Sequence, residues 1–240
     1  MAAACDPGVA RQHNEDAVYL GDNEQHGYYL AMVCDGMGGH NAGEIASAIA
    51  IECIPRFIRD NFSEQSPEAL LDAAFREASA QIDEHAAANP IAKGMGCTCV
   101  LLLGLDAKIY FAHSGDSRAY RSRGTQLTPM TVDHTMIQEM LDKGLLSPEQ
   151  AAIHPYRGRI SRCLGHGKNR DEPTVTQSTF AVGDSLLLCS DGLSDVVNEA
   201  DIRALMEQRD VRSGSRRLID AANTAGGPDN VSAILLRRPG

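Results

Sequence analysis

The chain has 240 residues, of which 43% are hydrophobic and 22% charged, which is enough for one domain with a full hydrophobic core. Its net charge of -10 and its lack of a basic run argue against a nucleic-acid partner, because binding to phosphate backbones draws on clustered Lys and Arg. No apolar run approaches the roughly 18 residues that a membrane span needs, and the start lacks a signal-peptide pattern. We expect one domain over residues 1–240.

The seven cysteines form an odd set without a Cys-x-x-Cys pair or a His-rich partner at zinc-finger spacing. Such cysteines are typical of reduced thiols. The sequence therefore predicts a cytoplasmic protein that binds neither nucleic acid nor membrane.

Helical and strand patterns follow one another in blocks along the chain. After a first predicted strand, AVYLG, apolar residues at helical spacing predict a helix over about 42–59, which Pro55 should kink or end. A Ser-Pro-Glu start predicts a second helix over about 67–87, and short β-rich runs predict an antiparallel meander over about 97–127. The remaining predictions are a polar helical stretch over 133–163, two strands within 174–190, helices near 199–208 and 213–224, and a closing strand, VSAILL. Separate runs of helices and strands indicate an α+β fold.

Four of the predicted strands carry an aspartate at one end. YYLAMVC ends at Asp35, IYFAHSG at Asp116 and SLLLCS at Asp191, while Asp229 precedes VSAILL. If these strands lie side by side, the carboxylates gather at one rim, where they repel one another unless they are protonated or share cations. A single Asp-Gly is usually an ordinary turn, but four such acids predict a metal site. Oxygen ligands without a nearby His or Cys pair favour Mg²⁺ or Mn²⁺ over zinc.

Glycines beside the first of these aspartates would serve such a site. Because glycine has no Cβ, the Gly36 carbonyl oxygen could approach an ion closely. Gly38 and Gly39 could adopt positive φ angles in the tight turn that follows.

Eight motifs along nearly the whole chain resemble, in the same order, those of the metal-dependent protein phosphatases of type 2C, the PPM family, in its bacterial branch. They are RQHNEDA (11–17), DGMGGH (35–40), GCT (96–98), GDSRAY (115–120), DHT (133–135), SRCLG (161–165), SDGL (190–193) and GGPDNVS (226–232). The resemblance implies a four-layer α/β/β/α sandwich of two antiparallel sheets flanked by helix pairs. It also implies a metal site at one end of the sandwich and a flap insert at about 134–162.

The resemblance assigns the metal ligands residue by residue. Asp35 would bridge two metal ions, the Gly36 carbonyl would bind the first, and Asp191 and Asp229 would complete the second. A third, weaker ion would be held by Asp116 together with Asp191.

Other residues receive supporting roles by the same resemblance. Glu15 and Asp16 would hold water molecules of the first ion. Arg11 would bind the substrate phosphate, for which its planar guanidinium is suited. Asn230 would orient Asp229 through a hydrogen bond.

The implied activity is hydrolysis of phosphoserine and phosphothreonine in proteins by a water or hydroxide that bridges two Mn²⁺ or Mg²⁺ ions. The expected partners are phosphorylated proteins, with a eukaryotic-like bacterial Ser/Thr kinase acting in opposition, and we expect a monomer. The chain departs from the family at Met37, where eukaryotic members carry a histidine proposed as the general acid. His40, or a water molecule on the third ion, could donate that proton instead.

Two other functions remain open at this stage. The first is a pseudoenzyme that binds phosphoproteins without hydrolysing them, and the intact Asp35, Asp191 and Asp229 argue against it. The second is a hydrolase of small phosphoesters or nucleotides, which no Gly-rich P-loop or basic groove in the sequence supports.

Several neighbouring residues also have open roles. Cys34 and Cys189 lie close enough to metal aspartates for a redox-sensitive site, although buried inert thiols are favoured. Arg118 is expected to anchor the turn around Asp116, and Asp133-His134 could shape the metal site from outside. The Gly96-Cys97-Thr98 motif departs from the family by a Cys where a second threonine is usual, and its role is expected to be packing.

Overall fold

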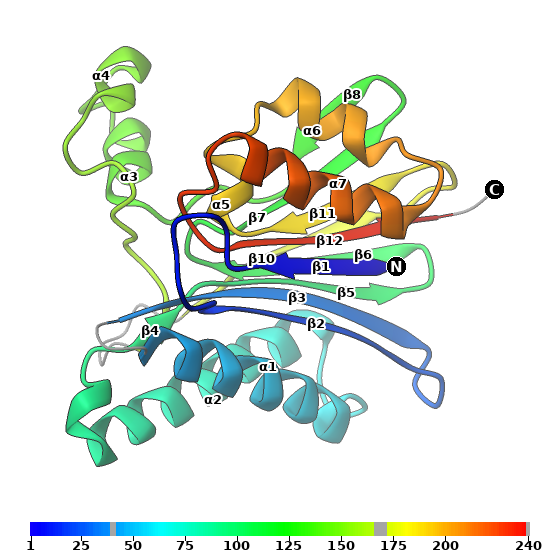
Figure 1. Ribbon diagram of the computed structural model, residues 1–240. Helices are drawn as coiled ribbons and strands as arrows, with labels where there is room; N and C mark the ends of the chain where they lie inside the picture. The colour runs from blue at the N-terminus through cyan, green and yellow to red at the C-terminus, as the bar shows by residue number, and fades with distance from the viewer. Residues whose placement is uncertain (39–41, 166–171, 239–240) are drawn as a thin grey trace.

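The computed structural model describes residues 1–38, 42–165 and 172–238. Two antiparallel sheets lie face to face, and helices cover the outer face of each sheet (Figure 1). This arrangement confirms the predicted α+β sandwich of four layers.

The first sheet has the strand order β1-β12-β11-β7-β8. Its strands are β1 (Ala2–Asp6), β7 (Arg118–Arg123), β8 (Gln126–Pro129), β11 (Ser185–Cys189) and β12 (Val231–Arg237). Helices α6 (Glu199–Met206) and α7 (Val211–Thr224) pack on it, where Leu187, Leu218 and Leu235 share one buried cluster. The prediction lacked β1, because AAACD shows no alternation of large apolar and polar side chains.

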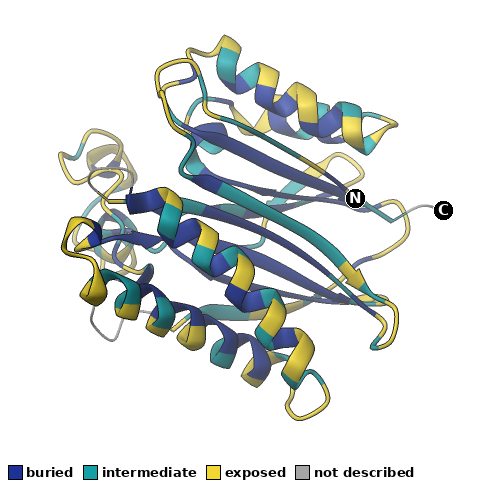
Figure 2. Ribbon diagram, turned by 60° about the horizontal axis from the view of Figure 1, so that its bottom comes forward, coloured by how far each residue is buried: buried dark blue, intermediate teal, exposed yellow. Residues whose placement is uncertain are grey.

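The second sheet has the order β10-β6-β5-β3-β4-β9, and β2 also pairs with β3. Its strands are β2 (Asp16–Asn23), β3 (Tyr28–Met37), β4 (Gly96–Cys97), β5 (Cys99–Leu105), β6 (Lys108–Ser114), β9 (Leu164–Gly165) and β10 (Thr174–Thr179). Helices α1 (Ala42–Asn61) and α2 (Pro67–Ala88) cover it, followed by a 3₁₀ turn at Pro90–Ala92. Figure 2 shows that both long helices turn a buried stripe toward the sheet and an exposed stripe toward solvent.

Strand β3 is buried on both faces. Leu30 and Met32 belong to the cluster beneath α1 and α2, whereas Ala31 and Val33 belong to the cluster between the two sheets. This double burial explains why YYLAMV is continuously apolar, without the alternation typical of a half-exposed strand.

Three details differ from the prediction. Helix α1 continues past Pro55 to Asn61, because Ile54 and Ile58 are fully buried and their packing offsets the hydrogen bond that proline removes. The predicted meander is divided, since β5 and β6 lie in the second sheet while β7 and β8 lie in the first. Strand β3 also extends past Asp35 to Met37, because Gly36 and Met37 still pair with β4.

The segment predicted as a flap contains two short helices, α3 (Met136–Asp142) and α4 (Pro148–Ala152), which lie beside the sandwich at its left-hand end in Figure 1. Thr135 and Ser147 cap their N-termini by accepting a backbone hydrogen bond from Gln138 and Gln150. The predicted polar helical stretch is thus mostly loop.

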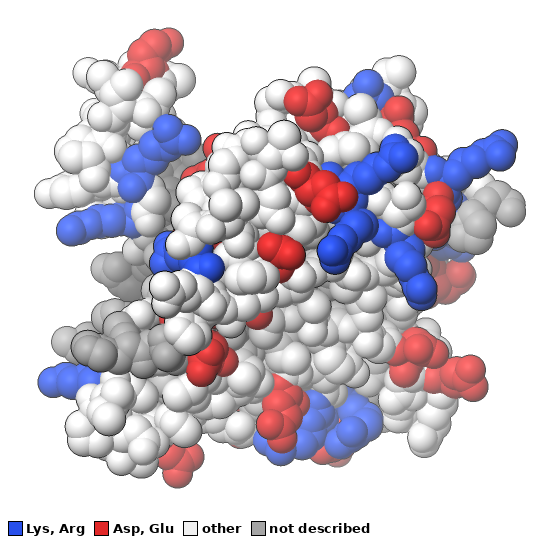
Figure 3. All heavy atoms as spheres, in the orientation of Figure 1, with Lys and Arg blue, Asp and Glu red and all other residues white. Residues whose placement is uncertain are grey.

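Two further features bear on the expected partners. On the face drawn in Figure 3, Lys and Arg side chains lie among Asp and Glu side chains. Within residues 1–38, 42–165 and 172–238, no helix is long and apolar enough to cross a membrane.

Candidate metal centre

The strand ends at one end of the sandwich bring the predicted aspartates together. Asp35, near the end of β3, stands opposite Asp16, the first residue of β2. Asp191 begins α5 (Asp191–Ser194), and Asp229 directly precedes Asn230 and β12. Burial, and then the negative charges of Asp16, Asp191 and Asp116, raise the pKa of Asp35 well above its ordinary value.

The crowded carboxylates fit a divalent cation. Burial raises the pKa of Asp16 to about 7, and the charges of Asp191 and Asp229 act in the same direction. One Asp16 oxygen accepts a hydrogen bond from the Ser190 hydroxyl at 2.7 Å. The other, Oδ1, and Asp191 Oδ1 are buried and have no hydrogen-bond partner among the described residues. Buried anionic oxygens without donors are the ligands that hard cations take.

Arg11 and Asp229 form an ion pair at the edge of this group. Arg11 Nη2 donates to Asp229 Oδ2 at 2.8 Å, and Arg11 Nε donates to the Pro228 carbonyl at 3.4 Å. Among the described residues, no three Asp, Glu, His or Cys side chains stand ready-made around one point where an ion could sit. In this structure the Arg11 guanidinium is bound to the carboxylate of Asp229, which was predicted to be a ligand of the second ion.

Gly36 is required by packing as well as by any role of its carbonyl. A Cβ at this position would lie 2.1 Å from the Gly43 carbonyl oxygen in the first turn of α1. The Gly36 N–H donates to the Glu15 carbonyl at 3.1 Å, which keeps the 11–16 segment against β3. Gly38 has a positive φ of 150°, as predicted. Gly39 and His40 lie outside the described residues, so the predictions made for them stay predictions.

Asn230 holds the N-terminal loop in addition to contacting Asp229, the contact predicted for it. Its side-chain oxygen accepts from the Glu15 N–H at 2.8 Å, and its amide nitrogen donates to the carbonyls of Pro7 at 2.9 Å and His13 at 2.8 Å. Only its backbone N–H reaches the Asp229 carboxylate, at 2.9 Å. Because the asparagine amide can donate and accept at once, it ties together the loop that carries Arg11 and Glu15.

Asn230→Ala should therefore destabilise the fold and lower activity together. Three hydrogen bonds of a side chain that is only 5% exposed are lost, and the stranded backbone groups make the loss roughly 2–4 kcal/mol. For a domain of this size the melting temperature should fall by roughly 5–15 °C. Thermal unfolding of Asn230→Ala measures this directly, and an unchanged melting temperature would contradict the structural role.

Thr98 does more than the packing that was expected of its motif. Its N–H donates to the Asp35 carbonyl at 2.8 Å, and its hydroxyl oxygen accepts from the Asp35 N–H at 3.1 Å. The same hydroxyl lies 2.7 Å from the Ser117 hydroxyl. Thr98 therefore connects Asp35 with the turn that carries Asp116, between β6 of the second sheet and β7 of the first. No local sequence pattern reveals this contact.

The Asp116 turn is tightly built. Gly115 has a φ of 109°, and a Cβ there would lie 2.6 Å from the Thr98 side chain, so only glycine fits. Burial, and then the charge of Asp191, raise the pKa of Asp116 to about 7. Asp195, which the sequence analysis missed, lines a cavity of about 300 Å³ together with Asp116 and Asp191. Its position one helical turn after Asp191 in SDGLSD was the available signal.

The raised pKa values predict an unusual pH dependence for the metal-free protein. In the unfolded chain Asp16 and Asp116 have a pKa of roughly 3.9, so between there and about 7 the folded state binds more protons. The free energy of unfolding should therefore fall as the pH rises through this range. With a chelator present, we expect a higher melting temperature at pH 6 than at pH 8.

With Mn²⁺ present, the melting temperature should instead be higher at pH 8 than at pH 6. Ionised carboxylates bind the metal, and metal binding stabilises the folded state. A chelated protein that becomes more stable between pH 6 and pH 8 would contradict the crowding of these acids.

The cysteines beside the site are buried. Cys34 and Cys189 have no exposed surface, and burial raises the pKa of Cys189 to about 12. A thiol with so little thiolate at neutral pH is unreactive, which favours the inert alternative over a redox-sensitive site.

Comparison with known proteins agrees with this geometry. The family model for protein phosphatase 2C matches residues 9–224. The chain is 39% identical to the serine/threonine protein phosphatase PstP of Mycobacterium tuberculosis over 98% of this chain but only 44% of that relative, so it spans less than half of PstP. It is 33% identical to the serine/threonine phosphatase stp of Listeria innocua, over 97% of this chain and 93% of that one.

Among solved structures, the catalytic domain of PstP in complex with two manganese ions superposes with a TM-score of 0.83. The identity is 37%, and the match covers 98% of this chain and 95% of the other. The family model covers most of the chain, and both relatives and the solved structure agree with it. The chain therefore belongs to the protein phosphatase 2C family.

Proposed function

We propose that this chain is a metal-dependent phosphatase that hydrolyses phosphoserine and phosphothreonine in proteins. The observation that carries the proposal is the rim where Asp16, Asp35 and Asp191 crowd together with unpaired buried oxygens, beside the exposed guanidinium of Arg11. The named activities of the two relatives support it. The proposed substrates are phosphorylated proteins, and the proposed partner is a Ser/Thr kinase whose action the phosphatase reverses. We propose that the chain itself is a cytoplasmic monomer.

The proposed ligand set follows the crowding of the acids. Asp35 would lie between two ions, with the Gly36 carbonyl on one and Asp191 and Asp229 on the other, while Glu15 and Asp16 would hold water. The two manganese ions in PstP support a pair of divalent ions, Mn²⁺ or Mg²⁺, here. When bound, such a pair supplies a water molecule with a lowered pKa as the nucleophile. A third ion at Asp116 and Asp191 is a further part of the proposal.

Arg11 would bind two oxygens of the substrate phosphate. Its side chain is 51% exposed and lies on the carboxylate of Asp229, so it already points to the rim. An ion that takes the Asp229 carboxylate would compete with this ion pair and leave the guanidinium fork available to a phosphate.

Arg11→Ala should chiefly raise KM, because the guanidinium binds phosphate in the ground state and in the transition state alike. Loss of a charge-assisted contact of roughly 1.5–3 kcal/mol corresponds to roughly a 10- to 100-fold rise. Arg59→Ala is the matched control, since Arg59 is an exposed arginine on α1 that is also paired with an aspartate, Asp60. Steady-state kinetics on a phosphopeptide decide the matter. If KM is unchanged while kcat collapses, Arg11 acts on the transition state instead.

One assay tests the proposed function against its alternatives. The chain should release phosphate from a phosphothreonine peptide in the presence of Mn²⁺ and stop when the metal is chelated. A pseudoenzyme would bind the peptide without releasing phosphate. A hydrolase of small phosphoesters would prefer a nucleotide monophosphate to the peptide at equal concentration.

A further inference from the structure

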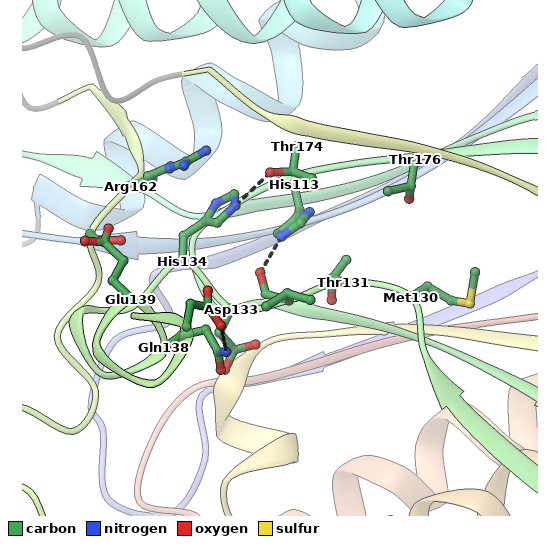
Figure 4. Close-up of a pocket in the computed structure, with 13 residues that line it drawn as sticks. His113, Met130, Thr131, Asp133, His134, Gln138, Glu139, Arg162, Thr174 and Thr176 are labelled. Atoms are coloured by element: carbon green, nitrogen blue, oxygen red, sulfur yellow. Dashed lines mark hydrogen bonds between the residues drawn. The ribbon is translucent and has the colours of Figure 1, made fainter. Parts of the chain in front are cut away.

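Side chains in the cavity drawn in Figure 4 already serve the fold. The imidazole rings of His113 and His134 are stacked with centroids 4.3 Å apart, and Figure 4 shows them bonded to a backbone carbonyl and to a threonine hydroxyl. Asp133 accepts from Arg118 Nε at 2.8 Å and from Arg118 Nη2 at 2.6 Å, which confirms Arg118 as an anchor of the turn around Asp116. These groups support the turn rather than a ligand.

A different surface, beside the metal rim, is apolar and exposed. It is formed by two loops, one between β1 and β2 and one between α7 and β12, which lie side by side at the left-hand end of Figure 1. Five exposed side chains without charge make up this surface, which we call the apolar shelf: Pro7, Val9, Ala10, Ala225 and Pro228. Val9 is 68% exposed, so the fold leaves most of its side chain in water.

The two loops hold Val9 rigidly. The N–H groups of Val9 and Ala10 both donate to the Gly227 carbonyl, at 2.9 Å and 3.0 Å. A Cβ at Gly227 would lie 2.8 Å from Val9 Cγ2, and a Cβ at Gly8 would lie 2.1 Å from the Asp229 carbonyl oxygen. The close approach of the loops therefore requires glycine at both positions. Because Val9 is β-branched, its side chain also has few rotamers.

Arg11 is bound to the same short segment as Val9. Val9 lies on Gly227, while Arg11 donates to the Pro228 carbonyl at 3.4 Å and to the Asp229 carboxylate at 2.8 Å. The apolar shelf is thus continuous with the guanidinium that is proposed to bind the substrate phosphate. Consecutive residues of a chain have Cα atoms only about 3.8 Å apart, so a residue that flanks a phosphoresidue held at Arg11 comes within reach of the shelf.

The shelf offers a kind of recognition that the rim cannot supply. The phosphate group is the same in every phosphoprotein, so contacts from Arg11 and the metal ions do not distinguish one phosphorylated segment from another. A rigid apolar surface favours an apolar neighbour, because it gains from the burial of apolar area and needs little further ordering when the ligand binds.

We propose that the apolar shelf, through Val9, binds an apolar residue that flanks the phosphorylated residue of a protein substrate and thereby selects among phosphoproteins. This inference rests on the proposed function, because it takes Arg11 as the residue that binds the phosphate. The occupant is the substrate itself, since the shelf adjoins the place where the phosphate would be held.

Three variants test the contact. Val9→Thr replaces one methyl group by a hydroxyl group, and it keeps the β-branched shape and the backbone hydrogen bonds of Val9. Val9→Ile keeps the apolar surface and should restore the contact. Val182→Thr is the matched control, since Val182 is 64% exposed and precedes the start of β11, whereas the rim residue Asp191 follows the end of that strand.

The readout is the ratio of kcat/KM for two phosphothreonine peptides in the presence of Mn²⁺. The peptides differ only in the residues on either side of the phosphothreonine, which are Leu in one and Asn, of similar size, in the other. The unaltered protein should prefer the Leu peptide by roughly three- to tenfold, as expected for the burial of one or two CH₂ groups. Val9→Thr should bring this ratio to within about twofold of equality, whereas Val9→Ile and Val182→Thr should retain it.

The outcomes separate failure of this inference from failure of the proposed function. If both peptides release phosphate equally well from the start, or if Val9→Thr retains the full preference, the shelf does not contact the substrate, although the proposed function stands. If neither peptide releases phosphate, the proposed function is wrong and this inference with it. A dimer in sedimentation that Val9→Thr dissociates would assign the shelf to a contact between two copies of the chain instead.

Discussion

Asp191→Asn should abolish turnover with Mn²⁺ and leave the fold intact. Asp191 is assigned both to the second core ion and to the third, so its loss removes charge stabilisation of several kcal/mol from the reaction, or roughly a hundredfold or more in kcat. The fold should survive because Asp191 Oδ1 makes no hydrogen bond within the described residues, and burial and neighbouring acids raise the pKa of this carboxyl. A neutral amide relieves that repulsion.

The measurements are kcat on a phosphopeptide and the melting temperature with and without Mn²⁺. The metal-free variant should melt at or above the temperature of the unaltered protein and should gain less stability from Mn²⁺. Asp220→Asn controls for the change of net charge, since Asp220 is an exposed aspartate on α7 that is paired with Arg216. A near-normal kcat in Asp191→Asn would refute the assignment of the metal ligands.

The sequence predicted the rim of acids because the signal is local. Each of Asp35, Asp116 and Asp191 follows a buried apolar run, and a strand that ends on a carboxylate can be recognised without knowing its neighbours. The order of the motifs then indicated the family resemblance, and this resemblance predicted the sandwich and its helix pairs. Helix α2 was found for the same reason, since its Ser66 cap and Pro67 lie next to each other in the chain.

What could not be predicted depends on contacts between distant parts of the chain. Asn230 bonds to Glu15 and Pro7, more than two hundred residues away, and only the pairing of β1 with β12 brings them together. The division of the β-rich runs between two sheets depends on the turn at Gly115, which looks like an ordinary Gly-Asp-Ser turn in the sequence. The continuation of α1 through Pro55 depends on burial against a sheet that the helix alone does not reveal.

The expected effect of Asp116→Ala depends on whether this aspartate binds an ion or shapes its turn. As an Asx residue its carboxylate would accept hydrogen bonds that hold the loop. The Asp116 carboxylate accepts a hydrogen bond from its own backbone, but other groups connect the turn to the rest of the fold. The Gly115 N–H donates to His134 Nδ1, the Ser117 and Thr98 hydroxyls are hydrogen-bonded, and Arg118 donates to the Asp133 carboxylate. Asp116 instead lies in the cavity with Asp191 and Asp195, and its pKa is raised to about 7 by burial and by their charges.

We therefore expect Asp116→Ala to keep its melting temperature and its two tight metal sites but to lose most activity toward phosphopeptides. The serine or threonine leaving group departs as an alkoxide and needs a proton, which Met37 cannot give and which a water molecule on a third ion could provide. Loss of such a proton donor typically lowers kcat by roughly 10²- to 10⁴-fold.

The loss should be much smaller with p-nitrophenyl phosphate, because nitrophenolate is a stable anion that leaves without protonation. The ratio of the two losses, measured on the same preparation at saturating Mn²⁺, is therefore the informative quantity. Equal losses on both substrates together with a lower melting temperature would show that Asp116 only shapes the turn. The proton for the leaving group would then have to come from a group other than a water molecule on an ion at Asp116.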